Sequence, residues 1–279
     1  MSNISLKLDE EKIIKLKDTF KEYIKESPNE YIETFIQKDD LTISIYKSGK
    51  VLFQGNDAFF YASAYLDKKI SRQAGSDEVG TGDYFGPVCV CACIVEEDQF
   101  SLLEELGVTD SKKLTDLKIE EIAPRLINEI VHSLLILEDK KYNEVHEKYN
   151  LNAIKAKLHN QAYINLIKKG YEIPKACYVD EFAPKELYFS YLSDDKEVFH
   201  DLIFETKAES AYPAVACASV IARYAFLIKM KEMKTKYGMT FHLGAGDEVN
   251  SDAMVFIEKY GRERLPEVAK LHFKNTEQL

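Results

Sequence analysis

The sequence predicts an α/β layer fold preceded by a small α+β unit, and three observations support this. Apolar runs typical of buried strands alternate with amphipathic stretches across residues 87–238. The 279 residues are 46% apolar and 30% charged, which is typical of a globular protein with a core. Residues 1–67 carry their own helix and hairpin patterns, and KKISRQAG follows as a polar linker. We therefore expect two domains, residues 1–67 and 68–279.

The amino-terminal unit contains two helix patterns and one hairpin pattern. Residues 9–27 have the apolar spacing of an amphipathic helix. LTISIYKSGKVLFQG, residues 41–55, predicts two strands joined by a two-residue turn at Ser48-Gly49. AFFYASAYLD, residues 58–67, predicts a second helix. A unit of this size lies near the lower limit for independent folding.

The main body alternates strands and helices. Continuous apolar residues from 87 to 95 predict a buried central strand. The long apolar stretch that begins at SAYPAV predicts a helix with Pro213 in its first turn and Gly238 as its stop. The other expected elements are a helix near 115–133, a strand near 131–138, a helix over 151–170 and a short buried strand in KACYVDEF.

Charge and composition limit the functional classes. The net charge of −10 argues against indiscriminate nucleic-acid binding, although a local basic patch would still allow a nucleic-acid enzyme. No run approaches the roughly 18 apolar residues of a membrane span, so we expect no membrane partner. The amino terminus carries charges where a signal peptide needs an apolar core. The five cysteines are an odd number, so we expect reduced thiols and a cytoplasmic protein.

Four acidic residues stand at the edges of expected core elements. They are Asp77 and Glu78 before the central strand, Asp180 at the end of a short apolar strand, and Glu209 just before the long helix. Burying such carboxylates without partners is costly, so something positive should meet them. Divalent cations prefer oxygen ligands, and paired metals can stabilise both oxygens of a phosphoryl displacement. The four acids are therefore candidate metal ligands.

The residues alone leave a second interpretation of these acids open. Adjacent strand residues point to opposite faces, so Asp77 and Glu78 share one site only if the chain bends. Gly75, Gly80 and Gly82 favour such a bend, but a solvated turn with an incidental acid pair fits the pattern too. Acids near a helix start, such as Glu209, are also common for electrostatic reasons alone.

Two other kinds of site, a dinucleotide-binding loop and a zinc site, fit the sequence less well. GTGDYFG misses the dinucleotide-binding fingerprint by one residue and directly follows two acids, which would repel a pyrophosphate. Close approach of backbone N–H groups to a sugar-phosphate chain is the better use of these glycines. Cys89, Cys91 and Cys93 alternate along one strand, whereas zinc ligands are usually spaced by turns. They are interpreted as small buried core residues.

One basic stretch has the composition of a phosphate contact. GVTDSKKLTD, residues 107–116, combines Ser111, Lys112 and Lys113 at an expected helix start. A solvated helix-entry loop is the alternative. Asp110, Asp247, Glu248 and Asp252 are further candidate accessory acids. Glu181 should face away from Asp180 if the strand continues.

Taken together, these motifs resemble the type 2 ribonuclease H family, and within it ribonuclease HIII. The matching stretches, in chain order, are GSDEVGTGDYFGPV, TDSKKL, NLNAIKAKLHNQA, VDEF, KAESAYPAVACASVIARYAF and LHFKNT. They extend from residue 75 to the carboxyl terminus, so the resemblance covers the whole main body. The amino-terminal YKSGKVLFQG resembles the extra domain of ribonuclease HIII, which has a TATA-binding-protein-like fold.

The resemblance implies a fold and an activity. The fold is an RNase H-like mixed sheet flanked by helices, preceded by a small TATA-binding-protein-like domain. The activity is hydrolysis of the RNA strand of RNA/DNA hybrids by a two-metal-ion mechanism with Mg²⁺ or Mn²⁺, leaving 5′-phosphate and 3′-hydroxyl ends. The acidic pair would then be met by metals and substrate rather than by protein cations. A monomer without a small-molecule cofactor, acting in DNA replication and repair, is the expected form.

The resemblance also implies roles for particular residues. Asp77, Glu78, Asp180 and Glu209 become the metal-binding acids, although many relatives carry aspartate at the last position. Gly80-Thr81-Gly82 stands where ribonuclease HII has Gly-Arg-Gly, a loop that contacts ribose 2′-hydroxyls through its backbone. The other implied substrate contacts are Ser111, Lys112, Lys113 and Asn152.

The amino-terminal unit is expected to bind substrate through its hairpin. Tyr46, Lys47, Lys50 and Gln54 surround that hairpin, where tyrosine can stack and lysine can meet phosphate. A stabilising appendage with a solvated hairpin is the alternative. Two other functions remain open at this point: incision at a single embedded ribonucleotide, as in ribonuclease HII, and a non-catalytic module that binds hybrids.

Overall fold

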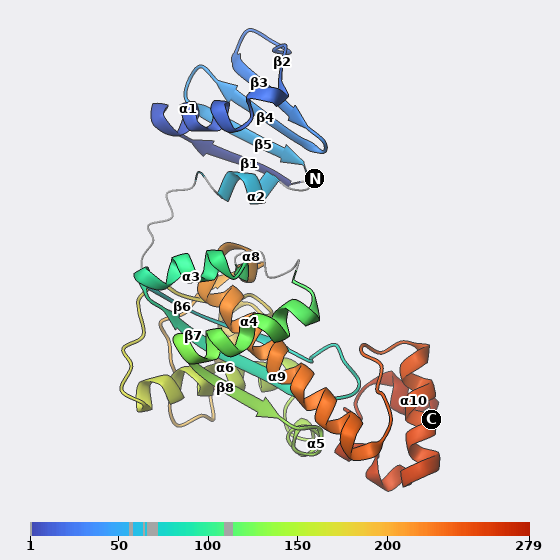
Figure 1. Ribbon diagram of the computed structural model, residues 1–279. Helices are drawn as coiled ribbons and strands as arrows, with labels where there is room; N and C mark the ends of the chain where they lie inside the picture. The colour runs from blue at the N-terminus through green and yellow to red at the C-terminus, as the bar shows by residue number, and fades with distance from the viewer. Residues whose placement is uncertain (1, 56–57, 64, 66–71, 109–113) are drawn as a thin grey trace. The chain divides into compact units, whose positions relative to one another are not determined.

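The computed structural model describes residues 2–55, 58–63, 65, 72–108 and 114–279, and these form two compact units (Figure 1). The units comprise residues 1–69 and 70–279. Each has its own sheet of five strands and its own hydrophobic core.

The first unit is an antiparallel sheet in the strand order β1-β5-β4-β3-β2, and its core side chains pack against α1 and α2. Alternation along the strands separates a buried face, with Ile43 and Phe53, from a more exposed face. The element bounds are β1 Ser2–Lys7, α1 Glu10–Thr19, β2 Ile24–Lys25, β3 Ile32–Lys38, β4 Leu41–Tyr46, β5 Lys50–Gly55 and α2 Ala58–Ser63.

Two expectations for this unit were wrong in detail. The helix expected over 9–27 ends at Thr19, because the following chain enters the sheet as β2 and pairs with β3. The hairpin loop has three residues, 47–49, with Gly49 at a φ of 78°. A three-residue hairpin places glycine in this left-handed conformation. Strands β1 and β3 were not expected at all.

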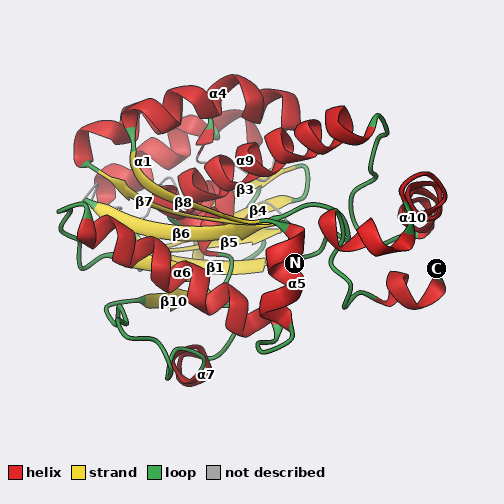
Figure 2. Cartoon of the chain, turned by 90° about the horizontal axis from the view of Figure 1, so that it is seen from below, coloured by secondary structure: helices red, strands yellow, loops and turns green. Residues whose placement is uncertain are grey.

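The second unit is a mixed sheet in the order β10-β9-β6-β7-β8, flanked by helices on both faces (Figure 2). Strand β6 is central, pairing antiparallel with β7 and parallel with β9. The strand bounds are β6 Gln73–Val79, β7 Val88–Val95, β8 Val131–Leu137, β9 Cys177–Asp180 and β10 Ile203–Glu205. The helix bounds are α3 Phe100–Glu105, α4 Asp116–Glu129, α5 Asp139–His146, α6 Leu151–Lys168, α7 Lys185–Ser190, α8 Ala208–Ala211, α9 Pro213–Tyr237 and α10 Asp247–Tyr260.

The α/β fold with a mixed sheet flanked by helices confirms the expectation from the sequence. Pro213 occupies the first turn of α9, and Gly238 ends it with a φ of 57°. Two boundaries were wrong. Residues 73–75 of the expected linker belong to β6, and the helix expected near 115–133 ends at Glu129, so that residues 131–133 belong to β8.

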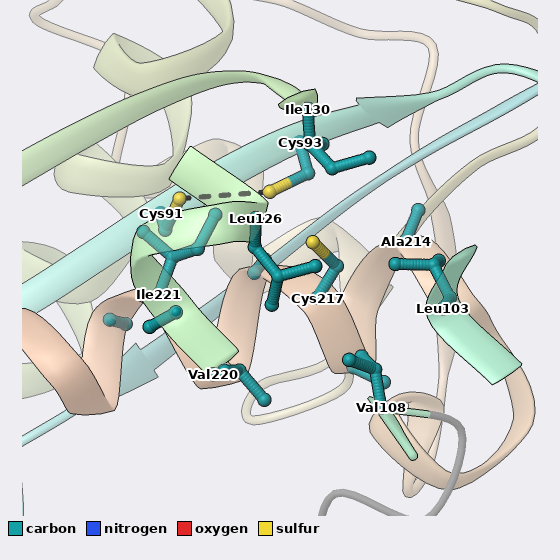
Figure 3. Packing of buried hydrophobic residues seen from close by; sticks show 14 of the residues in the cluster. Cys91, Cys93, Leu103, Val108, Leu126, Ile130, Ala214, Cys217, Val220 and Ile221 are labelled. Carbon is teal, nitrogen blue, oxygen red and sulfur yellow. Dashed lines mark hydrogen bonds between the residues drawn. The ribbon is translucent and has the colours of Figure 1, made fainter. Parts of the chain in front are cut away.

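Alternation along β7 assigns each face of the sheet to one set of helices. Odd-numbered residues of β7 pack against α9 and α4, and even-numbered residues pack on the opposite face, against α6 among others. Figure 3 shows Cys91, Cys93 and Cys217 together in the first of these cores, with 3.8 Å between the sulfurs of Cys91 and Cys93. All five cysteines are free and buried. Burial raises the pKa of Cys89 to about 12, so this thiol is unreactive.

Helix α9 is the central helix of this core. By length and composition alone it could cross a membrane, with a mean hydropathy of 1.4 over its most apolar window. The expectation that no segment approaches a membrane span was therefore wrong. Because 61% of that window is buried inside the protein, packing against the sheet accounts for its composition.

The close contact between α9 and β6 depends on Gly75. A Cβ atom at this position would lie 2.5 Å from the Val215 backbone nitrogen and 2.6 Å from its Cγ2. Glycine is therefore required by space, because a backbone nitrogen cannot move aside as a flexible side chain can. The bend expected at Gly75 is absent, and the register between β6 and β7 is unbroken from Gln73 to Val79.

We predict that Gly75→Ala destabilises the protein by about 3 kcal/mol, because an overpacked core must shift the helix from the sheet. Gly82→Ala is the matched control, since a Cβ there meets nothing within 4 Å. It should change stability by less than about 0.5 kcal/mol. Urea unfolding followed by circular dichroism measures both, and equal stability of the two variants would contradict the packing argument.

Candidate active site

Two candidate acids meet at the carboxyl ends of adjacent parallel strands. β6 and β9 pair in parallel with Ser76 opposite Val179, so Asp77 and Asp180 each stand one residue further along. Residues in register on parallel strands point to the same face. Asp77 is also paired with Cys91, which places both carboxylates on the α9 face of the sheet. The carboxyl ends of strands are where open α/β sheets bind ligands.

A short helix brings Glu209 to the same region. Lys207, directly before α8, has a φ of 57°, a left-handed conformation that is uncommon for a residue with a side chain. The turn directs the Ala208 N–H to Asp180 Oδ1, at 2.9 Å. Glu209 follows in the first turn of α8, and its charge acts on Asp77.

The electrostatics of Asp77 are those of a site with excess negative charge. Burial and then the charge of Glu78 raise the pKa of Asp77, and Glu209 adds to the effect. Hydrogen bonds from Ser219 and from the Glu78 N–H oppose it, but the pKa still rises to about 8. A divalent cation would relieve this excess of negative charge.

Glu78 points the other way, so the expectation that one bend would join Asp77 and Glu78 was wrong. Glu78 is paired with Val90, which packs on the α6 face of the sheet. Its side chain is only 11% exposed and contacts two residues of α6, Lys155 and His159. Lys155 forms an ion pair with Oε1, and His159 Nε2 lies 2.9 Å from Oε2.

These contacts also correct the expectation that protein cations would not neutralise the acidic pair. Burial alone would raise the pKa of Glu78, but His159 and Lys155 outweigh it and hold the pKa below 4.5. His159 Nδ1 is 2.7 Å from Ser76 Oγ, and the Lys155 ammonium lies 3.9 Å from the Phe182 ring centroid. Glu78 is therefore fixed as a carboxylate by a buried network.

The glycine loop after β6 borders a cavity of about 290 Å³. Gly80 has a φ of 92°, and a Cβ there would lie 2.1 Å from the Pro87 carbonyl oxygen. Gly82, by contrast, is exposed and has open space around it. The residues that line the cavity are Glu78, Val79, Gly80, Thr81, Gly82, Ile119, Ser219, Val220 and Arg223.

The site includes residues that the sequence did not single out. Lys155 and His159 lie inside a motif used for the resemblance, and their spacing of four residues on a helix could have indicated a shared face. Arg223 lines the cavity and forms a two-pronged ion pair with Asp116, with both N–O distances at 2.9 Å. Ser219 has no signal in the sequence, because serine is common in helices.

The other candidate residues lie elsewhere. Asn152 is exposed in the first turn of α6, and Asp247 and Glu248 are exposed in the first turn of α10. Asp252 accepts hydrogen bonds from His242 instead of joining the acids. Ser111, Lys112, Lys113 and Asp110 lie outside the described residues. Glu181 is exposed.

The hairpin residues lie on the amino-terminal sheet. Tyr46, Lys50 and Gln54 alternate with the buried Ile45, Val51 and Phe53, so they share the face opposite the helices. Lys47 is exposed in the loop.

The carboxylates are not drawn together into a closed ligand cage. Within the ranges that the structure describes, no group of three or more His, Cys, Asp or Glu side chains is spaced to hold a metal ion. Asp77, Asp180 and Glu209 nevertheless offer hard oxygen donors on one face, and the raised pKa of Asp77 marks an unmet negative charge. Their donor chemistry suits a divalent cation, whereas both Glu78 oxygens already have partners.

The protein is of the class with a mixed α/β sheet that carries carboxylates at the ends of two paired strands. Comparison with known families shows which family of this class it belongs to. Residues 74–276 match the family model described as Ribonuclease HII, and residues 3–78 match a domain of unknown function. Ribonuclease HIII of Lactococcus lactis is 41% identical over 99% of this chain and 97% of its own. Ribonuclease HIII of Bacillus mycoides is 42% identical over 85% and 84%.

Solved structures agree with this result. The crystal structure of Bst-RNase HIII in complex with Mn²⁺ has a TM-score of 0.75 and 33% identity, covering 99% of this chain and 97% of that one. The chain belongs to the ribonuclease HIII family, within the type 2 ribonucleases H. It is thus a metal-dependent ribonuclease H, an endoribonuclease that acts on RNA/DNA hybrids.

Proposed function

We propose that this enzyme hydrolyses the RNA strand of RNA/DNA hybrids at the α9 face of its mixed sheet, leaving 5′-phosphate and 3′-hydroxyl ends. The observation that carries the proposal is the convergence of Asp77 and Asp180 at the ends of paired parallel strands, with Glu209 acting on Asp77. Asp77, Asp180 and Glu209 would hold two divalent ions, Mg²⁺ or Mn²⁺. When bound, such ions activate a water and stabilise the leaving oxygen.

The chain's own residues have distinct parts in this site. Asp77 must lose its proton before it can serve as a ligand, since its pKa is raised to about 8. The Ala208 N–H holds Asp180 Oδ1 and so fixes which way that carboxylate faces. Glu78, held by Lys155 and His159, contributes a fixed negative charge to the Asp77 environment. On the resemblance alone we propose Glu78 as a fourth metal ligand, a role that would require one of its oxygens to leave Lys155 or His159.

Substrate recognition would use the Gly80-Thr81-Gly82 loop. Gly82 is exposed and has no side chain, so its backbone can approach a ribose closely, while Gly80 supplies the positive φ of the loop. The 2′-hydroxyl is the group that distinguishes RNA from DNA. Ser111, Lys112, Lys113 and Asn152 remain proposed substrate contacts on the resemblance alone. Arg223 at the cavity adds a positive charge that suits a phosphate.

The amino-terminal unit would bind the hybrid through the exposed face of its sheet. Tyr46, Lys50 and Gln54 point from that face, and Lys47 extends from the loop beside them. The positions suit phosphate contacts and stacking. We also infer a cytoplasmic monomer acting in DNA replication and repair, a setting with which five free, buried thiols are consistent.

We predict that Asp77→Asn and Asp180→Asn each abolish cleavage while preserving the fold, because the amide keeps the shape and loses the charge. Glu209→Gln should also be damaging. Cleavage of a labelled RNA/DNA hybrid in Mg²⁺ and in Mn²⁺ measures the loss, with Glu181→Gln as the exposed carboxylate control. If either aspartate variant kept more than roughly a tenth of wild-type turnover, about 1.4 kcal/mol of barrier, the assignment would be wrong. A duplex with one ribonucleotide, run beside one with four, separates hybrid cleavage from single-ribonucleotide incision.

We predict that Mn²⁺ binding releases a proton from Asp77. With the pKa of this carboxyl raised to about 8, most molecules hold the proton below that pH. The apparent Mn²⁺ affinity should therefore increase about tenfold per pH unit from pH 6 to 8 and then level off. Calorimetric titration in two buffers of different ionisation enthalpy counts the proton. Equal affinity at pH 6 and pH 8 would show that Asp77 is already ionised in the free enzyme.

We predict that Lys47→Ala with Lys50→Ala in the full chain raises KM for the hybrid more than it lowers kcat, because remote phosphate contacts contribute mainly uniform binding. The slope of log affinity against log salt should decrease by about 1 to 2. Lys15→Ala is the control for loss of a single lysine charge, since Lys15 is exposed on α1, which packs on the opposite face of that sheet. If the double variant and the control had the same affinity and the same salt slope, this face would not bind the substrate.

A further inference from the structure

The loop that joins β6 to β7 has two halves with different surroundings. Gly80, Thr81 and Gly82 border the cavity, and Gly82 is exposed with open space around it. Tyr84, Phe85 and Gly86 are fully buried. The buried half contacts the end of the chain, more than 180 residues away in sequence.

Backbone pairing joins this buried half to the carboxyl-terminal segment. The Gly86 N–H donates to the Val268 carbonyl at 3.1 Å, and the Lys270 N–H donates to the Tyr84 carbonyl at 2.8 Å. Phe85 and Ala269 form an antiparallel bridge between these two bonds. Residues 268–270 therefore lie beside the loop and pair with it through one isolated antiparallel bridge.

Two further contacts hold the loop ends. The Gly244 N–H donates to Asp83 Oδ1 at 2.7 Å, and the Tyr84 N–H donates to the Gly244 carbonyl at 2.8 Å. Tyr84 Oη and Thr276 Oγ1 are 3.0 Å apart. The loop is thus held both by Gly244, between α9 and α10, and by residues 268–276 near the carboxyl terminus.

A buried lysine lies at the centre of this arrangement. The Lys270 side chain has no exposed surface, and its ammonium donates to the Asp83 carbonyl at 2.9 Å and to the Gly86 carbonyl. Both acceptors are in the loop and three residues apart, so one charged group closes the turn between them. Asp139 Oδ1 lies 3.9 Å away and has no hydrogen-bond partner of its own.

Burying the Lys270 ammonium costs free energy, which indicates that this side chain does more than fill space in the core. Burying an ammonium is expensive unless it is paired and hydrogen-bonded, and an apolar side chain of the same length would avoid that cost. What an apolar side chain could not do is hold two carbonyl oxygens of a tight loop at once. The positive charge makes these bonds stronger than neutral ones.

We propose that Lys270 is a positioning residue for substrate binding, which holds residues 83–86 so that the Gly80-Thr81-Gly82 backbone is preset to meet the ribose of the RNA strand. The inference rests on the proposed function, because it assigns a purpose to the loop of that same site. It also gives the carboxyl-terminal segment a role: the segment braces the recognition loop from the side away from the cavity.

The test uses full-length Lys270→Met/Asp139→Asn, which removes both buried charges together and leaves neither stranded. Asp139→Asn alone is the control: it keeps the ammonium and its two carbonyl contacts but leaves that buried charge without its carboxylate, so it is assayed at a temperature where circular dichroism shows it folded. The double variant should raise KM for the hybrid about tenfold with kcat within about threefold, because a preset loop contributes binding. The control should stay within about twofold of wild type in both. A KM within twofold of wild type in a folded double variant would overturn the proposal.

Hydrogen exchange gives a readout that does not depend on activity. Amides of residues 80–86 should exchange faster in the double variant and at the wild-type rate in the control, because the loop loses its brace only in the former. If the double variant does not fold, Lys270→Gln/Asp139→Asn decides the matter: its shorter, neutral side chain cannot hold both carbonyl oxygens as the ammonium does, and it should raise KM about threefold with kcat unchanged. Unchanged KM and exchange in this variant would overturn the proposal. A wild-type enzyme that failed to cleave hybrids would instead refute the proposed function, leaving the exchange result to stand by itself.

Discussion

The close approach of α9 to β6 at Gly75 sets the geometry of the mixed-sheet domain. Because no Cβ separates them, the Val215 backbone lies directly on the strand. Ser219 follows Val215 by four residues and so lies on the same side of the helix, one turn further along. Asp77 follows Gly75 by two residues and so points from the same face of the strand. Because the helix and the strand advance side by side, the Ser219 hydroxyl contacts the Asp77 carboxylate near the end of the strand.

The carboxylates of the adjacent residues Asp77 and Glu78 are both buried, but their surroundings differ. Glu78 is matched by Lys155 and His159, so its pKa stays low and its position is fixed by the protein. Asp77 has no such cation, and burial beside other carboxylates raises its pKa to about 8. A strand passing between two helical layers creates this difference, because its alternate residues enter two different environments. The charge of Glu78 is thus matched within the protein, whereas the proposed metal would meet the charge of Asp77.

The loop between β6 and β7 connects the acid-bearing strand to residues near the carboxyl terminus. The proposed contact of residues 80–82 with a substrate needs one side of that backbone open, although Gly80 itself is buried. The next residues, 83–86, are held by backbone pairing and by Lys270. A rigid support beside an open segment is a common way to build a binding loop. The late motif in the sequence therefore belongs to the same structural unit as the first acids.

The sequence by itself determined the α/β class, the long core helix with its ends at Pro213 and Gly238, and the family, because these depend on periodicity, on proline and glycine, and on motif order. It also identified the acids as candidates, since residue type alone limits which groups can bind a divalent cation. It did not reveal β1 and β3, whose short patterns are stabilised by neighbouring strands rather than by local preference.

Only the tertiary structure decided which acids share a face and what neutralises each of them. Asp77 and Glu78 are adjacent in sequence but point to opposite faces of the sheet, because the pairing of β6 with β7 continues through them without a bend. Lys155, His159 and Ser219 come from helices whose own sequences give no sign of the strand they will meet. Lys270 likewise reads as an ordinary surface lysine until the fold buries it. Charges act through distance, and the distances between segments far apart in the chain exist only once the sheet and its helices have packed.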